Sequence, residues 1–268
     1  MLLIEQKPKE LLQEFLDEYL TTHLVNRSKA EEMIKNAIAY YTGDKNKRDQ
    51  MFHLIDLENK WYKSFCKDFS IYDDDYYFTD LWACWVTYSR KYIRLLIKPN
   101  SINNQYSVYD FTKNITSALD LGCGIGFTTS SLKQIYPNAR VSATNIENTK
   151  QFKFCKIMSE KYNFAIYPDV KKISGNQDLI FASEYFEHIE NPVAHLEDVL
   201  QLNPKFLIIA NSFNTRSMGH FTHYQHKDKI ILENKMNKIF NDALRDNNYI
   251  KVKTNFWNNR PAFWRSNN

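Results

Sequence analysis

One short stretch constrains the fold of this chain more than any other. Residues 117–127 read SALDLGCGIGF, so a short apolar run meets an acid and then glycines on alternate positions. The pattern predicts a buried strand that ends in a glycine-rich turn, followed by a helix that begins near Phe127. The glycines leave one side of the backbone bare, so a ligand can lie against the main chain. We therefore expect a ligand at this turn, within reach of the first amide groups of the helix.

The spacing of the glycines limits which ligand the turn can hold. A dinucleotide-binding turn needs glycines at relative positions one, three and six, but the sixth position is Phe127. No Gly-Lys-Ser or Gly-Lys-Thr follows, as a phosphate-binding loop would require. Asp120 stands directly before the turn. Its carboxylate would repel a pyrophosphate and is better suited to a cationic or hydroxyl-bearing ligand.

Two segments resemble a known family. Residues 119–126, LDLGCGIG, look like the first motif of the class I (Rossmann-like) S-adenosylmethionine-dependent methyltransferases. Residues 178–192, DLIFASEYFEHIENP, resemble the fourth strand and the following segment of small-molecule members such as the quinone-biosynthesis O-methyltransferases. The resemblance covers about residues 115–257. It implies S-adenosylmethionine as cofactor and S-adenosylhomocysteine as product, with the ammonium group near the acid and the carboxylate near the loop.

The resemblance implies methyl transfer to a small-molecule or modified-nucleotide acceptor by in-line displacement. Two alternatives remain open: methylation of a nucleic-acid hydroxyl or a protein, and a non-catalytic scaffold that binds S-adenosylmethionine. Enzymes that methylate exocyclic amines of bases carry an Asn/Asp-Pro-Pro-aromatic motif after the fourth strand, where this chain has residues 183–186, SEYF. A nucleic-acid acceptor is therefore possible but not favoured.

The order of the expected elements predicts an α/β fold. A polar segment rich in turn formers, residues 99–105, divides a helical part, residues 1–105, from a methyltransferase domain, residues 106–268. In the second part strands and helices alternate, as in a mostly parallel sheet with an antiparallel last strand. We predict strands at 117–121, 140–145, 163–167, 178–183, 205–211 and 249–257. We predict helices at 127–136, 148–161, 191–201 and 227–247. In the first part we predict helical structure over 1–42, with a second helix that starts at about residue 28. A loop at 43–50 and helices at 50–69 and 79–97 should follow.

The carboxyl ends of the strands should form the cofactor site. The family usually places an acid for the ribose hydroxyls where this chain has Asn145, which can donate and accept hydrogen bonds, with Glu147 as a possible substitute. Asp169 looks like the residue that meets the adenine amino group, although a turn-forming Asp is an equal alternative. The predicted cofactor-binding residues are Asp120, Gly122, Cys123, Gly124, Gly126, Asn145, Ile146, Asp169, Ser183 and Glu184.

A hydroxyl or amine acceptor needs a base that removes a proton. The candidates are His188, Glu187 and Tyr185 after the fourth strand, and His220 and His223 after the fifth. Structural hydrogen bonding is the alternative for each, and His220, His223 and His226 have the spacing of zinc ligands on a helix. Residues 73–75 are consecutive aspartates, which we interpret as a helix cap rather than a metal site. We predict no metal.

Bulk properties set wider limits. The net charge of +4 neither demands nor excludes an anionic partner. The four cysteines form no Cys-x-x-Cys pair, which predicts a reducing, cytoplasmic location. An acidic residue, Glu5, comes too early in the chain for a signal sequence. No apolar run approaches the roughly 20 residues of a membrane span. We therefore expect no membrane partner. The helical part is interpreted as a lid that shapes the acceptor pocket and excludes water.

Overall fold

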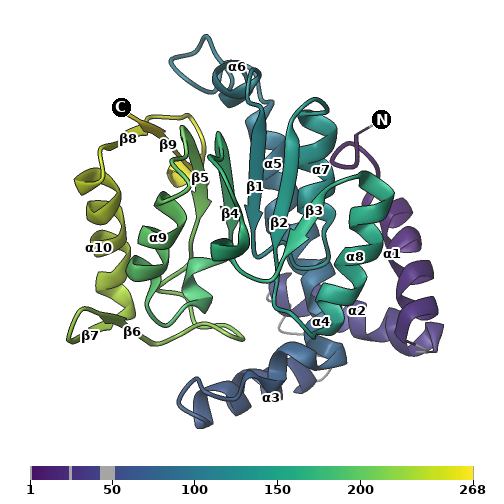
Figure 1. The fold of residues 1–268 in the computed structure, drawn as a ribbon. Coiled ribbons are helices and arrows are strands. Elements are labelled where there is room, and N and C mark those ends of the chain that lie inside the picture. The colour runs from purple at the N-terminus through teal and green to yellow at the C-terminus, as the bar shows by residue number, and fades with distance from the viewer. Residues whose placement is uncertain (1, 24–25, 43–51, 268) are drawn as a thin grey trace.

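The computed structural model describes residues 2–23, 26–42 and 52–267, and Figure 1 shows their arrangement. The loop expected at 43–50 lies outside the described residues. The strands of the main sheet are β1 (Ser117–Leu121), β2 (Arg140–Thr144), β3 (Ala165–Tyr167), β4 (Leu179–Ser183), β5 (Phe206–Ala210), β8 (Tyr249–Val252) and β9 (Ala262–Ser266).

The strand order in this sheet is β3-β2-β1-β4-β5-β9-β8. Neighbouring strands from β3 to β5 are parallel, with Leu119 of β1 opposite Ile180 of β4. The last strand, β9, runs antiparallel to both β5 and β8. The predicted fold class, a Rossmann-like methyltransferase sheet with mostly parallel strands and an antiparallel last strand, is confirmed.

The C-terminal part differs from the prediction in two places. The expected strand at 249–257 is shorter and ends at Val252, and a further strand, β9, follows it. Pro261 stands immediately before β9, and no strand was predicted after residue 257. The predicted helix at 227–247 is also wrong at its start. A hairpin of β6 (His223–His226) and β7 (Lys229–Leu232) turns at Lys227, whose φ is +53°, and α10 (Glu233–Asp246) begins only after it.

The other helices beside the sheet lie close to their predicted positions. They are α7 (Phe127–Ile135), α8 (Lys150–Tyr162) and α9 (Pro192–Leu200). The side chain of Thr149 caps α8, and Asn191 caps α9 with a proline in the first helical turn. Short 3-10 turns follow β3 and β4: η4 (Val170–Lys172) and η5 (Phe186–His188). None of the helices in the described ranges combines the length and apolar character needed to cross a bilayer.

The N-terminal part is helical, as predicted. Its elements are α1 (Pro8–His23), α2 (Arg27–Thr42), α3 (Phe52–Lys63), η2 (Phe69–Asp73), α4 (Asp75–Cys84), η3 (Trp85–Ser89), α5 (Arg90–Leu96) and α6 (Val108–Thr112). The expected helix at 79–97 corresponds to α4, η3 and α5, with η3 as a π-helical turn within it. It starts earlier than predicted because Asp74 caps α4 by accepting a 2.8 Å hydrogen bond from the Tyr76 amide.

Two hydrophobic clusters hold the molecule together, and both parts of the chain contribute to each. Phe15 of α1 packs against Phe154 of α8 with ring centroids 5.4 Å apart, and Trp85 packs against Phe127 of α7 at 4.9 Å. The side chains of β1 alternate, so that Ala118 belongs to the core on the α7 and α8 side and Leu119 to the core on the α9 and α10 side. Helices α2, α3 and α4 lie at the carboxyl ends of the strands (Figure 1). The N-terminal part therefore covers the edge of the sheet at which ligands bind in this kind of fold.

Candidate functional site

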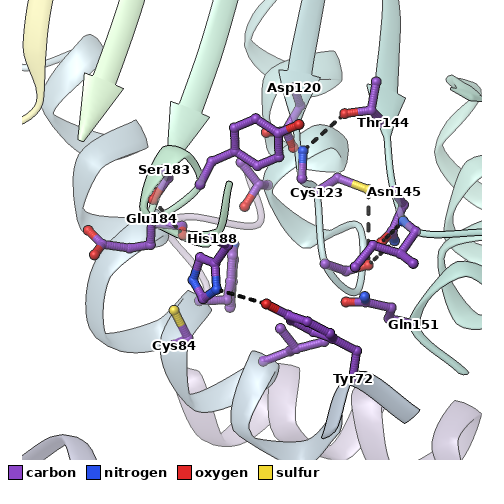
Figure 2. A pocket seen from close by; sticks show the side chains of 18 of the residues that line it. Tyr72, Cys84, Asp120, Cys123, Thr144, Asn145, Gln151, Ser183, Glu184 and His188 are labelled. Atoms are coloured by element: carbon purple, nitrogen blue, oxygen red, sulfur yellow. Dashed lines mark hydrogen bonds between the residues drawn. The ribbon is translucent and has the colours of Figure 1, made fainter. Parts of the chain in front are cut away.

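The carboxyl ends of β1, β2 and β4 open onto a cavity of about 660 Å³. This volume lies within the range of about 300–1,000 Å³ that is usual for small-molecule sites. Its walls come from the glycine loop, the ends of β2 and β4, the segment after β5, and the N-terminal residues 69–89 (Figure 2). The cavity therefore lies between the two parts of the chain.

Most of the residues predicted from the sequence face this one cavity. The predicted cofactor-binding residues that line it are Asp120, Gly122, Cys123, Gly124, Asn145, Ile146, Asp169, Ser183 and Glu184. The predicted catalytic candidates that line it are Tyr185, His188 and His220. Gly126, Glu187 and His223 are not part of its lining.

The three loop glycines have different surroundings, although all have positive φ. A Cβ on Gly122 would lie 2.3 Å from the Tyr185 ring, so this bare backbone accommodates a protein side chain. A Cβ on Gly126 would lie 3.0 Å from Cβ of Met158 in α8, so this glycine permits close helix packing. At Gly124 the nearest atom is 3.6 Å away, on the Leu81 side chain, and the backbone is open to the cavity.

We predict that Gly126→Ala lowers the free energy of unfolding by about 2–3 kcal/mol, because it adds both backbone strain and a steric overlap with α8. Gly175→Ala is the matched control: its φ is +78°, but the nearest atom to an added Cβ is 3.9 Å away. That control should cost about 1 kcal/mol. Urea unfolding of both variants measures the difference, and equal losses would contradict the packing role of Gly126.

Asp120 is buried, with 1% of its surface exposed, and lines the cavity. Its Oδ2 accepts a 2.6 Å hydrogen bond from the Thr129 hydroxyl in α7. Burial raises the pKa of Asp120 to about 7, and the Thr129 hydrogen bond partly opposes the rise. A cation bound beside this carboxyl would favour its ionised form, which fits the cationic ligand expected from the sequence.

Asn145, at the end of β2, uses its side chain to hold the glycine loop. Its Nδ2 donates to the Gly124 carbonyl at 2.6 Å, and its Oδ1 accepts from the Ile146 amide at 2.9 Å. Gln151, in the first turn of α8, also lines the cavity and is only 4% exposed. Its side-chain amide has no hydrogen bond to any described residue. Gln151, which was not predicted as a site residue, therefore offers a buried donor and acceptor to a ligand (Figure 2).

Asp169, which follows β3, caps a turn and also lines the cavity. Its Oδ1 accepts a 2.8 Å hydrogen bond from the Lys171 amide and caps η4, as expected of a turn-forming aspartate. It also lines the cavity. Ile146 is 47% exposed at the cavity wall.

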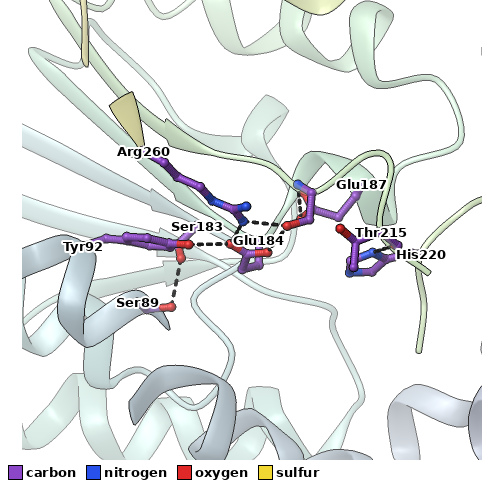
Figure 3. Close-up of polar contacts among 9 residues, drawn as sticks. Ser89, Tyr92, Ser183, Glu184, Glu187, Thr215, His220 and Arg260 are labelled. Carbon is purple, nitrogen blue, oxygen red and sulfur yellow. Dashed lines mark hydrogen bonds and ion pairs between the residues drawn. The ribbon is translucent and has the colours of Figure 1, made fainter. Parts of the chain in front are cut away.

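Glu184 lies at the centre of a polar network that joins four segments (Figure 3). Its φ is +51°, an uncommon conformation for a non-glycine residue. One carboxylate oxygen accepts from the Tyr92 hydroxyl of α5 at 3.2 Å and is ion-paired with Arg260, and the other accepts from the Ser212 hydroxyl at 2.8 Å. Arg260 also donates to Ser212 at 2.6 Å. Protein donors thus hold the carboxylate. Through it, α5 is joined to the residues just after β4, just after β5 and just before β9.

Tyr185 and Glu187, which follow Glu184 in the chain, have different surroundings. Tyr185 covers Gly122 and its hydroxyl forms a 2.8 Å hydrogen bond with Nε2 of His195. Glu187 is fully buried, and its Oε1 accepts from the Ser212 amide at 2.8 Å. Burial, and next the neighbouring Glu184, raise the pKa of Glu187 well above its usual range. Glu187 is not part of the cavity lining.

His188 faces the cavity beside a tyrosine from the N-terminal part. The Tyr72 hydroxyl lies 3.3 Å from Nδ1 of His188 and 3.4 Å from the Gly219 carbonyl. A Cβ on Gly219 would come within 2.7 Å of both side chains, so a glycine is required there. When the Tyr72 hydroxyl donates to Gly219, its oxygen can accept from Nδ1–H, which leaves the lone pair on Nε2. Nε2 has no hydrogen bond to a described residue, and the ring lines the cavity.

His220 packs edge-on against His188 with ring centroids 4.7 Å apart, and its Nδ1 lies 2.7 Å from the Thr215 carbonyl. Burial lowers the pKa of both histidines. His223 is on the β6 hairpin, where its Nδ1 lies 3.2 Å from the Thr222 hydroxyl. The three histidines considered for zinc are therefore not on a helix. Within the described ranges, no group of three His, Cys, Asp or Glu side chains could hold a metal ion.

Many residues that line this cavity were not predicted as site residues, and Gln151, Arg260 and Tyr72 are three of them. Gln151 reads as an ordinary residue of an amphipathic helix, and only its missing hydrogen-bond partner distinguishes it. Arg260 lies after the expected end of the sheet, and Tyr72 belongs to the helical part, far from His188 in sequence. No local motif could have found the last two, because their positions depend on how distant segments pack.

No protein-family model matches the chain, and a search of curated proteins finds no match. Solved structures do match. The N-terminal domain of EvdMO1 with S-adenosylhomocysteine bound is 14% identical, with 58% of this chain and 84% of that chain covered and a TM-score of 0.37. The mitomycin 7-O-methyltransferase MmcR is 8% identical, with 76% of this chain and 59% of that chain covered and a TM-score of 0.49. The plantazolicin methyltransferase BpumL is 18% identical, with 69% of this chain and 61% of that chain covered and a TM-score of 0.34. The chain thus spans less than two thirds of MmcR and BpumL.

Proposed function

We propose that this protein transfers a methyl group from S-adenosylmethionine to a small-molecule acceptor. The observation that carries the proposal is the convergence of three ligand-binding features on one cavity. Asp120, the open backbone of Gly124, and Gln151, whose side-chain amide has no hydrogen bond to a described residue, all line it. A neutral histidine, His188, lines the same cavity. A binding site and a proton acceptor therefore share one enclosed space.

The residues present fit S-adenosylmethionine. This cofactor carries an activated methyl group on a sulfonium, and its amino acid part brings an ammonium group. Asp120 would hold the cationic part, and the backbone of the glycine loop would receive the carboxylate. Gln151 would bind the ribose hydroxyls in place of the usual acid, because Asn145 already holds the loop. Asp169 and Ile146 would flank the adenine, since both line the cavity next to the end of β3.

His188 is the base in this proposal, and Tyr72 is its positioning residue. The Tyr72 hydroxyl and the Gly219 backbone lie at Nδ1, so Nε2 is the nitrogen that accepts a proton from the acceptor. Because burial keeps the imidazole neutral, His188 is ready to accept that proton at neutral pH. Alignment of the acceptor with the methyl group supplies the larger effect, of about 7–11 kcal/mol in favourable cases.

The N-terminal helical part acts as a lid in this proposal. It supplies Tyr72 and Trp85 to the cavity wall, and it is tied to the sheet by the 2.9 Å contact between the hydroxyls of Ser89 and Ser183. The π-helical turn η3 places Ser89 at this contact. The lid excludes water from the reacting groups.

The test is transfer of a labelled methyl group from S-adenosylmethionine into a cell extract that is then separated into small molecules, protein and nucleic acid. The proposal predicts label in the small-molecule fraction. Label only in protein or RNA would favour the alternative acceptors. No transfer into any fraction, together with retained binding of the cofactor, would favour a scaffold.

We predict that Gln151→Leu weakens S-adenosylhomocysteine binding about 10-fold, because a buried hydrogen bond to the ligand is lost. The same change should leave the free energy of unfolding of the ligand-free protein within about 1 kcal/mol of the wild-type value, because the Gln151 side chain has no hydrogen bond to a described residue that would be lost. Gln177→Leu is the matched control: Gln177 is also a buried glutamine, but it lies outside the cavity.

Calorimetric titration and urea unfolding measure the two effects of Gln151→Leu. The control variant should bind S-adenosylhomocysteine as the wild type does. Wild-type affinity in Gln151→Leu would show that the ribose is bound elsewhere.

A further inference from the structure

One end of the cavity has walls of a different kind from the glycine-loop end. We call it the aromatic compartment, and its residues are Phe69, Tyr72, Tyr77, His188, Met218 and His220. The rings of Phe69 and Tyr72 stack with centroids 6.2 Å apart, and Tyr77 meets Tyr72 edge-on at 4.9 Å. Flat apolar walls of this kind favour a flat, apolar ligand.

The charges around the cavity act against an anionic acceptor. In the part of the chain that the structure describes, Arg260 is the sole lysine or arginine that lines the cavity, and it is held by Glu184 and Ser212. Carboxyl groups from several segments line the same space, including Asp120 and Asp169. A carboxylate or phosphate on the acceptor would therefore enter without a free cation to pair with it.

The position of His188 selects the reacting group. His188 lines the cavity, its Nδ1 lies 3.3 Å from the Tyr72 hydroxyl, and its Nε2 has no hydrogen bond to a described residue, which leaves Nε2 available to a ligand. A proton acceptor of this strength is matched by an acidic O–H group. A phenol, with a pKa of about 10 as in tyrosine, transfers its proton to imidazole far more readily than an aliphatic alcohol.

We propose that the acceptor is an uncharged phenol, bound between the rings of the aromatic compartment with its hydroxyl at Nε2 of His188. The inference rests on the proposed methyltransferase function and names its substrate class. The phenol oxygen forms a bond to the methyl carbon as the bond between that carbon and sulfur breaks. The electron pair of the broken bond stays on sulfur, and the phenol proton passes to His188. An aryl methyl ether and a protonated imidazole result, and the imidazole returns its proton to solvent.

The test uses probes that share one carbon skeleton: 2-naphthol, 2-naphthoate, 2-naphthyl phosphate and the non-aromatic decahydro-2-naphthol. Each is titrated by calorimetry into protein saturated with S-adenosylhomocysteine. We expect 2-naphthol to bind at least about 10-fold more tightly than the two anions, because burial of an unpaired charge is unfavourable. We also expect 2-methoxynaphthalene to form when 2-naphthol is incubated with S-adenosylmethionine.

A variant pair tests the compartment itself. Phe69→Ala removes a ring that is 57% exposed at the cavity, so the fold should tolerate the change. It should weaken 2-naphthol binding about 3- to 10-fold. Phe65→Ala is the matched control, since Phe65 is 76% exposed and does not line the cavity. It should bind 2-naphthol as the wild type does.

The possible outcomes separate the inference from the function on which it rests. Equal or tighter binding of an anionic probe or of decahydro-2-naphthol overturns the phenol assignment. So does the absence of 2-naphthol binding in protein that binds S-adenosylhomocysteine, in which case the proposed methyltransferase function stands. Failure to bind S-adenosylhomocysteine overturns the proposed function instead.

Discussion

Arg260→Met is expected to lower the free energy of unfolding by about 3 kcal/mol, because it leaves the Glu184 carboxylate buried without its cation. The Glu184 side chain is only 11% exposed, and Arg260 is its ion-pair partner. The substitution also removes the hydrogen bond from Arg260 to Ser212. Methionine is similar in length and apolar, so the loss measures the charge pair more than the packing.

Two further variants make the Arg260 result interpretable. Lys171→Met breaks a surface ion pair with Asp198, in which the lysine side chain is 66% exposed, and should cost at most about 1 kcal/mol. Glu184→Gln placed in the Arg260→Met background should recover part of the loss, because a neutral amide is easier to bury than a carboxylate. Equal losses in Arg260→Met and Lys171→Met would contradict a buried network that fastens the lid to the sheet.

His188→Gln is expected to lower the rate constant of methyl transfer to 2-naphthol by about 10²- to 10⁴-fold, the usual effect of losing a general base. Glutamine can fill much of the same space and keeps a polar group toward Tyr72, but it cannot accept a proton at neutral pH. Binding of S-adenosylhomocysteine should remain at the wild-type level, since the proposal assigns none of the cofactor contacts to His188. A comparable loss of cofactor affinity would instead indicate a structural role for His188.

The pH dependence of the wild-type rate gives an independent test of the same base. Burial, and next the neighbouring His220, lower the pKa of His188 well below its usual value, while a hydrogen bond with the Gly219 backbone opposes this. The deprotonated ring is the active form, so activity is lost only when the pH falls through this lowered pKa. The rate constant should stay level from about pH 8 to below about pH 6.5. An acid limb centred above pH 7 would contradict His188 as the base.

The sequence was most informative where function depends on a local pattern. The alternating glycines after β1 and the segment after β4 placed Asp120, Gly124 and His188 at one rim, because parallel strands end at the same edge of a sheet. The sequence predicted six of the strands but not their order in the sheet, and β9 was missed. The neighbours of β9 in the sheet, β5 and β8, come from other parts of the chain, so its place depends on pairing between distant segments.

Other features could not be read from the sequence because they depend on side-chain contacts across the fold. The glycine pattern suggested a cradle that is bare throughout, but the ring of Tyr185 covers Gly122 and α8 packs on Gly126. Likewise, the hydrogen bonds of Asn145 to the glycine loop give Gln151 its place as the polar residue facing the cavity. A hydrogen bond within the protein changes which residue is available to a ligand, and no spacing rule reports that change.

The most direct test of the central claim is a calorimetric titration of the wild-type protein with S-adenosylhomocysteine. The account predicts saturable binding to one site per chain, with S-adenosylmethionine competing for it and with both ligands raising the melting temperature. Absence of binding heat and of a thermal shift with either ligand would contradict the assignment of the cavity between the glycine loop and the helical lid as a cofactor site.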